Sequence, residues 1–375
     1  MYNMKNIYKF LTVIIVIIIV TIASVTIFQN IKKADTGKPV VKIGVILPLT
    51  GDLAFIGKSL KSGAELAVDE LKETKYRYEL IFEDDQINPT KSVSALNKLV
   101  SFDNISGVIS FSGTVGQALA PVAEKLKVPH FAISSDLGAA VGDYNYINFV
   151  SPVDEAKTFV SALKDKNIKK IATFSQSGNS GIKMAFDNVE EGLKENSIKN
   201  TTEYFNAGDK DFRTIIQKLQ DTSPDIYFLL ARSPEIELIA KQLREVGITT
   251  PITSIEGFGL STQLSLYEGQ WFVDPAEPST DFMKKMQDKY GNVPSVYAAN
   301  VYDSIKLFVK AVEGTGDGSA IPSNSDMNKN LSKIIKEKYD GAVGKGLYFD
   351  NNGVLVDKAG IKEIRNGEIV YIGRK

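Results

Sequence analysis

Short apolar runs of strand length alternate with segments of helical periodicity along most of this 375-residue chain. In the first half the runs fall at residues 41–47, 79–82, 107–111 and 130–133. Apolar residues recur between these runs at the three-to-four-residue spacing of a helix face. Such alternation predicts an α/β fold in which a parallel sheet is covered by helices on both faces.

The same pattern restarts after Pro152. It predicts strands at residues 170–174, 225–230 and 252–255, with helices near 154–167, 180–195, 210–221 and 234–246. The roughly 337 residues after position 38 exceed what a single hydrophobic core usually serves. We therefore expect two doubly wound lobes.

The N-terminal region contains a long apolar segment, residues 10–28, without a single charge. A helix of that length is about as long as the hydrocarbon core of a bilayer is thick. We expect residues 1–38 to form a signal-anchor and linker that place the remaining chain outside the cytoplasm, with a cleaved signal as the alternative. Because the chain has no cysteine, it has neither a disulfide nor a lipidated N-terminal cysteine.

Charge and composition argue against several function classes. The 44 basic and 45 acidic side chains are interspersed without a basic stripe, which argues against nucleic acid as a partner. Thiol chemistry is excluded, and His130 is the only candidate base for a serine hydrolase. It is the first residue of a predicted strand, whereas a ligand site in such a fold is expected at strand ends, so a structural role is expected. No cofactor or metal motif is present, and we expect a protein that is not an enzyme.

Eight sequence motifs together carry a family resemblance. The opening motifs are KIGVILPLTGDLAFIGKSLKSGAELAVDEL, FEDDQINPTKSVSALNKLV and GTVGQALAPVAEKLKVPHFAISS, and later ones include SIEGFGLS, EGQWFVDP and PSVYAANVYDSIKLFVKAVE. In order and spacing they resemble the type I periplasmic binding proteins of ABC transporters that capture branched-chain amino acids (leucine, isoleucine and valine). The resemblance covers about residues 41–372.

The resemblance implies a clamshell in which a three-strand hinge joins the lobes and the chain crosses near residues 150, 273 and 341. Lobe I would then hold residues 39–149 and 274–340, and lobe II residues 150–273 and 341–375. The ligand would lie at the carboxyl ends of the strands of both lobes. Closure about the hinge would bury it.

Polar side chains follow the predicted strands where such a ligand would bind. An amino acid loses the hydration of its carboxylate and its ammonium on entry, so each group needs a partner in the site. In the resembled family, hydroxyls at two strand ends hold the carboxylate and help to hold the amine, and an acid binds the amine. These roles fall on Ser112 or Thr114, on Ser134 or Ser135, and on Glu256. The alternative is that the hydroxyl residues are ordinary turn and cap residues and that Glu256 is a solvated loop acid.

Three positions depart from the branched-chain pattern and bear on ligand identity. Ile56 and Ser180 stand where the family has pocket aromatics, and Arg232 stands where an aromatic often precedes Pro-Glu. A guanidinium fork there would favour an acidic or amide-bearing ligand. Alternatively, Arg232 pairs with Glu235 or points to solvent.

We therefore expect a membrane-tethered extracytoplasmic protein that captures an amino-acid-like ligand and delivers it to the permease subunits of an ABC transporter. One alternative is an anchored sensor of the same fold that acts through a separate receptor. The alternative of another class is an exported hydrolase that uses His130.

Overall fold

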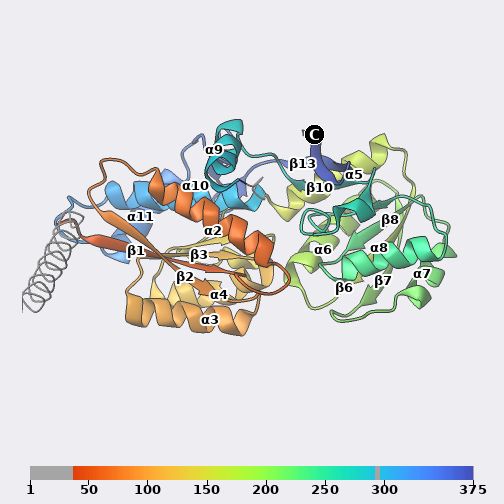
Figure 1. The fold of residues 1–375 in the computed structure, drawn as a ribbon, viewed down its shortest axis with the longest axis horizontal. Coiled ribbons are helices and arrows are strands. Elements are labelled where there is room, and N and C mark those ends of the chain that lie inside the picture. Colours follow the sequence, from red (N-terminus) through yellow and green to blue (C-terminus); the bar gives the residue numbers. More distant parts are fainter. Residues whose placement is uncertain (1–36, 292–295, 375) are drawn as a thin grey trace, which may run out of the picture.

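The structure, a computed structural model, describes residues 37–291 and 296–374, which form two α/β units side by side along the long axis (Figure 1). The first unit is built on a five-stranded parallel sheet of order β2-β1-β3-β4-β5. Its strands are β1 (Val40–Leu47), β2 (Arg77–Asp84), β3 (Gly107–Phe111), β4 (His130–Ile133) and β5 (Asn145–Ile147).

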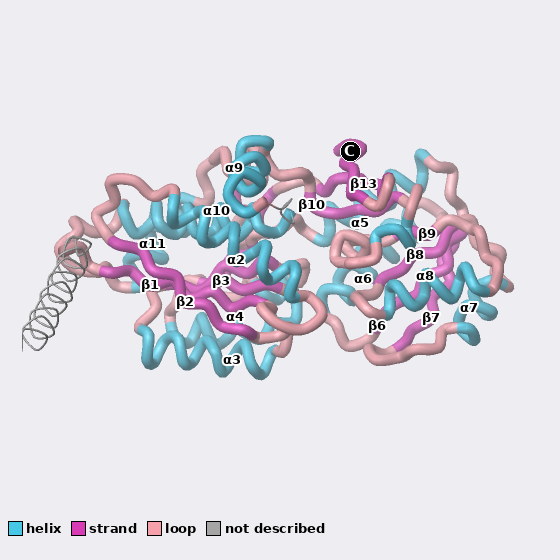
Figure 2. Tube along the Cα trace, viewed as in Figure 1, coloured by secondary structure: helices cyan, strands magenta, loops and turns pink. Residues whose placement is uncertain are grey.

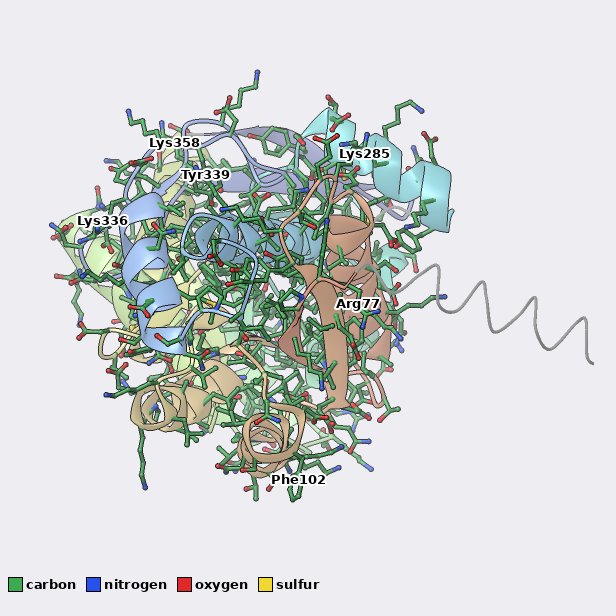
Figure 3. All side chains as sticks on the ribbon, turned by 90° about the vertical axis from the view of Figure 1, so that its left-hand side faces the viewer. Arg77, Phe102, Lys285, Lys336, Tyr339 and Lys358 are labelled. Atoms are coloured by element: carbon green, nitrogen blue, oxygen red, sulfur yellow. The ribbon has the colours of Figure 1, made fainter. Side chains whose placement is uncertain are left out.

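Helices cover both faces of this sheet, as Figure 2 shows in cyan and magenta. One face carries α2 (Ala54–Asp69), α10 (Val296–Glu313) and α11 (Asn324–Ile334), and the other carries α3 (Pro89–Lys98) and α4 (Gly113–Leu126). Helices α2 and α10 pack tightly because Gly63 has no side chain; a Cβ there would lie 2.5 Å from the Ala298 carbonyl oxygen. A π-helical turn, η1 (Leu99–Asp103), extends α3 and carries the exposed Phe102 (Figure 3).

The second unit has a four-stranded parallel sheet of order β7-β6-β8-β9. Its strands are β6 (Lys170–Gln176), β7 (Lys199–Phe205), β8 (Ile226–Leu230) and β9 (Ile252–Thr253), and its helices are α5 (Pro152–Asp165), α6 (Ser180–Glu195), α7 (Arg213–Gln220) and α8 (Glu235–Glu245). Phe212, Phe258 and Phe272 belong to a hydrophobic core within this unit. The expected parallel α/β architecture is thus present in both halves.

A small antiparallel sheet lies at the junction of the units, with order β10-β13-β14. It is formed by β10 (Trp271–Pro275), β13 (Ala359–Arg365) and β14 (Glu368–Arg374). The remaining elements are α9 (Thr280–Tyr290), a β11 (Tyr348–Phe349) and β12 (Leu355–Val356) pair, and two short 3-10 turns, η2 (Leu137–Ala139) and η3 (Leu264–Tyr267). The chain passes between the units after β5, after β10 and after β12.

The hinge differs from the expected one in two respects. The described residues 148–151 of the first crossing form no strand, so the hinge is not made of three strands. The third crossing follows β12 near residue 357, not residue 341. Residues 347–356 instead pack on the first unit: the Ile147 N–H donates to the Gly353 carbonyl at 2.8 Å, and the Phe349 ring lies 5.9 Å from that of Phe131. These buried apolar contacts hold the segment there.

Among the described residues, no helix is long and apolar enough to cross a membrane. The expected anchor at residues 10–28 lies outside the described residues.

Candidate ligand-binding site

A cavity of about 50 Å³ lies between the carboxyl ends of the two parallel sheets. The first unit lines it with Phe111, Ser112, Ser135, Phe149 and Tyr297, among others. The second unit contributes Asn179, Arg232, Glu256 and Leu260. Ser112, Ser135, Asn179, Arg232 and Glu256 each follow a strand, namely β3, β4, β6, β8 and β9 in that order. A space of this size has room for only a few water molecules, so an amino acid would enter only when the units move apart.

Two helix N-termini face each other across this cavity. Helix α4 begins after Ser112, whose side chain makes no capping hydrogen bond, and α6 begins after Asn179, which caps it by accepting from the Ile182 N–H at 3.0 Å. A Cβ built on Gly113 would lie 3.2 Å from the Gly181 backbone, so the two units touch here. The uncapped N–H groups of α4 and both helix dipoles favour a bound carboxylate.

Two residues at the cavity have strained backbones. Ser112 has φ +93° and Glu256 has φ +57°, in the region that favours glycine. Non-glycine residues held in such conformations cost of order 1–3 kcal/mol each and are concentrated at ligand clamps and active sites. The strain marks both positions as places where the side chain matters.

An ion pair joins the two charged residues of the cavity. The Arg232 Nη2 donates to Glu256 Oε2 at 2.8 Å, and the side chains are 22% and 7% exposed. The Arg232 N–H is itself held by the Gln176 side-chain oxygen at 2.9 Å. Burial is the largest single effect and disfavours the guanidinium charge, but Glu256 together with the other acidic neighbours raises the pKa of Arg232. Arg232 thus pairs with Glu256 and not with Glu235, which instead accepts from the Gly208 N–H at 2.6 Å.

A second buried charge cluster lies behind the cavity at the hinge. Lys362 of β13 donates to Asp274 of β10 at 2.8 Å, and both side chains are almost fully buried. The Tyr297 hydroxyl of α10 donates to the other Asp274 oxygen at 3.2 Å. Burial raises the pKa of Asp274 to about 6, although Lys362 opposes the shift. Tyr297 thus links the cavity and the first unit to the hinge strands.

The structure brings four of the eight sequence-predicted residues to the cavity wall: Ser112, Ser135, Arg232 and Glu256. The other four are close by in other settings. The Thr114 hydroxyl lies 3.4 Å from that of Ser112. Ser134 is buried and closes a turn, accepting from the Asp136 N–H at 3.0 Å.

The two positions that replace family aromatics also lie off the cavity wall. Ile56 is 2% exposed and packs in the core of the first unit, while Leu53 from the same loop reaches the cavity. The Ser180 hydroxyl is buried without a hydrogen-bond partner among the described residues, and its neighbour Asn179 lines the wall. At both positions a neighbouring residue, Leu53 or Asn179, lines the cavity wall instead.

Sequence reasoning did not select Asn179, Phe149, Leu260 or Tyr297. Asn179 carries a readable signal, since an Asn before a helical pattern is a typical cap. No sequence signal reveals Phe149 and Tyr297. Their rings stack with centroids 5.7 Å apart, although the two residues lie far apart in the sequence.

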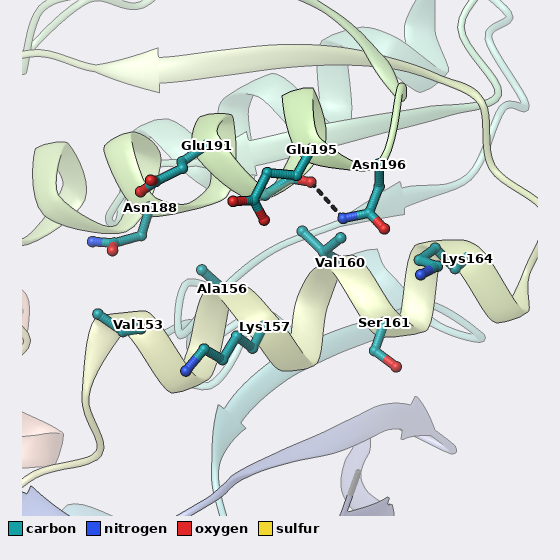
Figure 4. A pocket seen from close by; sticks show the side chains of 11 residues that line it. Val153, Ala156, Lys157, Val160, Ser161, Lys164, Asn188, Glu191, Glu195 and Asn196 are labelled. Atoms are coloured by element: carbon teal, nitrogen blue, oxygen red, sulfur yellow. Dashed lines mark hydrogen bonds between the residues drawn. The ribbon is translucent and has the colours of Figure 1, made fainter.

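Larger hollows occur elsewhere, but none of the three described here lies between the strand ends of the two units. One of about 390 Å³ lies between α5 and α6 (Figure 4). Its charged side chains come from two facing helices, Lys157 from α5 and Glu191 and Glu195 from α6 (Figure 4). The small cavity between the units therefore remains the better candidate.

His130 is fully buried in the sheet of the first unit. Its Nδ1 lies 2.8 Å from the Asn145 side-chain oxygen and its Nε2 lies 2.8 Å from the Ser110 hydroxyl. Asn145 uses its amide hydrogens on the Ala120 and Val141 carbonyls, so the neutral ring donates from Nδ1 and accepts at Nε2. This position gives a substrate no access, which argues against the hydrolase alternative. In the described part of the chain no cluster of metal-ligating side chains occurs.

Acid should destabilise the protein through His130. Burial lowers the pKa of the ring from 6.5 to about 4, so its contribution is complete above pH 6.5 and is lost as the pH falls toward 4. At about 1.4 kcal/mol per unit the loss is up to about 3 kcal/mol. Asp274, with its raised pKa, changes in the opposite direction, but it does so equally in a His130→Gln variant. Unfolding measured from pH 7 to 4.5 should therefore show a smaller loss in the variant; equal losses would contradict the assignment.

Comparison with known proteins identifies the family. Residues 40–368 match the family model described as periplasmic binding protein, so the chain belongs to the periplasmic binding protein family. A Leu/Ile/Val-binding protein homologue of Brucella melitensis is 26% identical over 325 residues, which cover 80% of this chain and 86% of that protein. A leucine-, isoleucine-, valine-, threonine- and alanine-binding protein of Pseudomonas aeruginosa is 24% identical, covering 86% of this chain and 88% of that protein.

Solved structures show the same fold. A leucine-binding protein of Thermotoga maritima superposes with a TM-score of 0.81 at 22% identity, covering 89% of this chain and 98% of that one. A solute-binding protein of Rhodopseudomonas palustris, in complex with 3,4-dihydroxybenzoic acid, superposes with a TM-score of 0.77 at 20% identity, covering 90% and 97% of the two chains. These similarities favour neither the sensor nor the hydrolase alternative.

Proposed function

We propose that this protein captures a small amino-acid-like ligand outside the cytoplasm and delivers it to the permease subunits of an ABC transporter. The observation that carries the proposal is the meeting of the α4 N-terminus with Arg232 and Glu256 in one cavity between the units. The site offers a carboxylate-binding end and an amine-binding acid. The family membership and the named ligands of the relatives support the same function.

Binding would proceed by closure and not by catalysis. The ligand carboxylate would accept from the uncapped N–H groups of α4 and from Ser112 or Ser135, while its ammonium would pair with Glu256. Because these partners come from different units, the ligand stabilises the closed arrangement by contacting both. The surface that a permease reads would then exist only in the closed form.

The moving lobes would follow the observed packing. We assign residues 39–149 and 276–356 to lobe I and residues 150–275 and 357–374 to lobe II. Compared with the sequence-based boundaries, the third crossing moves because residues 347–356 pack on the first sheet.

The pocket chemistry points to a polar ligand. The relatives are named for leucine, isoleucine and valine, one of them also for threonine and alanine, and one structural neighbour holds an aromatic carboxylate. These ligands share a carboxylate, which α4 is suited to bind. Arg232 adds a guanidinium fork that favours an acidic or amide-bearing side chain.

A thermal-shift screen would test the ligand class directly. We expect L-glutamate or L-glutamine to raise the unfolding temperature of residues 38–375, since a ligand at about 100 times its Kd adds about 2.7 kcal/mol. Glu256→Ala should abolish the shift, and Arg232→Ala should reduce it more for these ligands than for L-leucine. Glu245→Ala, an exposed acid on α8, is the matched control and should change nothing. If no amino acid shifts the wild type, the amine-binding role of Glu256 is wrong.

We also propose that residues 10–28 anchor the protein in the membrane. Alkaline carbonate extraction of membranes should leave the full-length chain in the pellet, and the mature protein should retain its N-terminal segment. A released protein that begins after residue 28 would show a cleaved signal instead.

A further inference from the structure

Glu155 is a buried acid without a partner beside the candidate site. It lies in the first turn of α5, directly after the first crossing between the units, and its side chain is fully buried. Neither carboxyl oxygen has a hydrogen-bond partner among the described residues. An ionised carboxylate left in this state would cost several kcal/mol.

The surrounding charges explain why this group is unpaired. Its electrostatic neighbours are Glu256, Asp274, Arg232 and the adjacent Asp154. Of the nearby cations, Arg232 is committed to Glu256 and Lys362 of β13 to Asp274, each at 2.8 Å. Burial first, and then Glu256 and Asp274, raise the pKa of Glu155 well above its usual range, which favours the protonated, uncharged carboxyl.

We propose that Glu155 is the second acceptor for the Arg232 guanidinium, which turns to it when a ligand ammonium occupies Glu256. This step rests on the proposed function. In the ligand-free cavity Arg232 is paired with Glu256, the acid proposed to bind the ligand ammonium. A ligand must therefore carry a cation to displace Arg232 from Glu256. Glu155 would then give its proton to solvent and receive the displaced charge. The fork of the guanidinium leaves its other edge free for a ligand oxygen.

The exchange makes the site selective for amine-bearing carboxylates. A simple aromatic acid has no cation to offer Glu256, and it would leave Arg232 where it is. Because α5 packs against hinge strands β10 and β13, the transfer of charge to Glu155 also takes place next to the pivot. Ligand recognition and hinge position would therefore share one side chain.

A thermodynamic cycle tests the exchange without any ligand. Glu256→Gln removes the charge that holds Arg232, as a bound ammonium would. In the wild type, Glu155→Gln should leave the unfolding midpoint unchanged or raise it, because it removes an unpaired acid. In the Glu256→Gln background the same change should lower the midpoint, since Arg232 now depends on Glu155. A midpoint that falls only in the Glu256→Gln background supports the exchange, and equal shifts in the two backgrounds overturn it.

Two further measurements keep the test decisive. Asp85→Asn is the matched control, because Asp85 is a buried acid of the first unit that accepts from Ile87 and Ser92, and its effect should be the same in both backgrounds. If the double variant does not fold, a crystal structure of Glu256→Gln decides: Arg232 within about 4 Å of Glu155 supports the exchange, and Arg232 directed elsewhere refutes it. A ligand screen without hits would contradict the proposed function, but the thermodynamic cycle would still test the exchange of Arg232 between the two acids.

Discussion

Replacing Gly181 with valine is expected to hold the two units apart and to weaken ligand binding by about 100-fold or more. A Cβ at this position would lie 2.8 Å from the Ser135 hydroxyl across the cavity, and valine adds two methyl groups beyond that Cβ. The loss corresponds to about 2.7 kcal/mol, the value of the cross-unit contacts that closure adds. Titration calorimetry with a ligand from the screen measures it.

The fold should tolerate this substitution. Gly181 has an ordinary helical backbone and, within its own unit, only the Asn179 side chain is near its Cβ position, at 3.4 Å. Gly181→Ala should have a smaller effect, because the Ser135 hydroxyl can rotate away. X-ray scattering should show a more extended valine variant. Unchanged affinity and an unchanged radius of gyration would mean that the helix N-termini do not meet during binding.

Replacing Lys362 with methionine should strongly destabilise the folded protein. The variant leaves the Asp274 carboxyl buried without its cation, which costs about 3–5 kcal/mol of unfolding free energy. Asp274 escapes the cost by binding a proton, so the effect should be larger at pH 8 than at pH 5. Chemical denaturation at the two pH values measures both the loss and its direction.

The double variant Lys362→Met, Asp274→Leu provides the internal control. Without either charge the hinge should regain most of its stability, because a buried pair can be replaced by apolar residues at little cost. Lys289→Met, at an exposed pair with Asp69, should change stability by less than about 1 kcal/mol. A loss in Lys362→Met as small as this would show that the buried pair is not what holds the hinge strands.

The sequence predicts some elements to the residue and does not reveal others. β3 and β4 are continuous apolar runs, and their bounds match the prediction. β7 is different, because KNTTEYF is a polar edge strand with no apolar run to reveal it. The lobe to which residues 347–356 belong is not visible in the sequence either, because it depends on the buried packing of Phe349 against Phe131, a tertiary contact.

Charge pairing is the least predictable feature of the site. Glu256 stands out in the sequence because an acid follows an apolar strand directly. Its partner does not, since Arg232 is 24 positions away and Glu235 is much nearer along the chain. In the sequence, Glu155 looks like an ordinary acid in the first turn of a surface helix, where the helix dipole favours a negative charge. Burial alone distinguishes it, and that burial depends on the hinge strands β10 and β13.

At position 112, folding stability and ligand binding favour different residues. Its φ of +93° and ψ of 145° suit glycine, so a Ser112→Gly chain would relieve strain while losing a hydroxyl at the cavity. Directed evolution for thermal stability alone would therefore favour Ser112→Gly. The same substitution would remove a hydroxyl from the proposed ligand site. If the protein is stabilised for use as a biosensor scaffold, Ser112 should be kept and the stabilising substitutions should be placed at other positions.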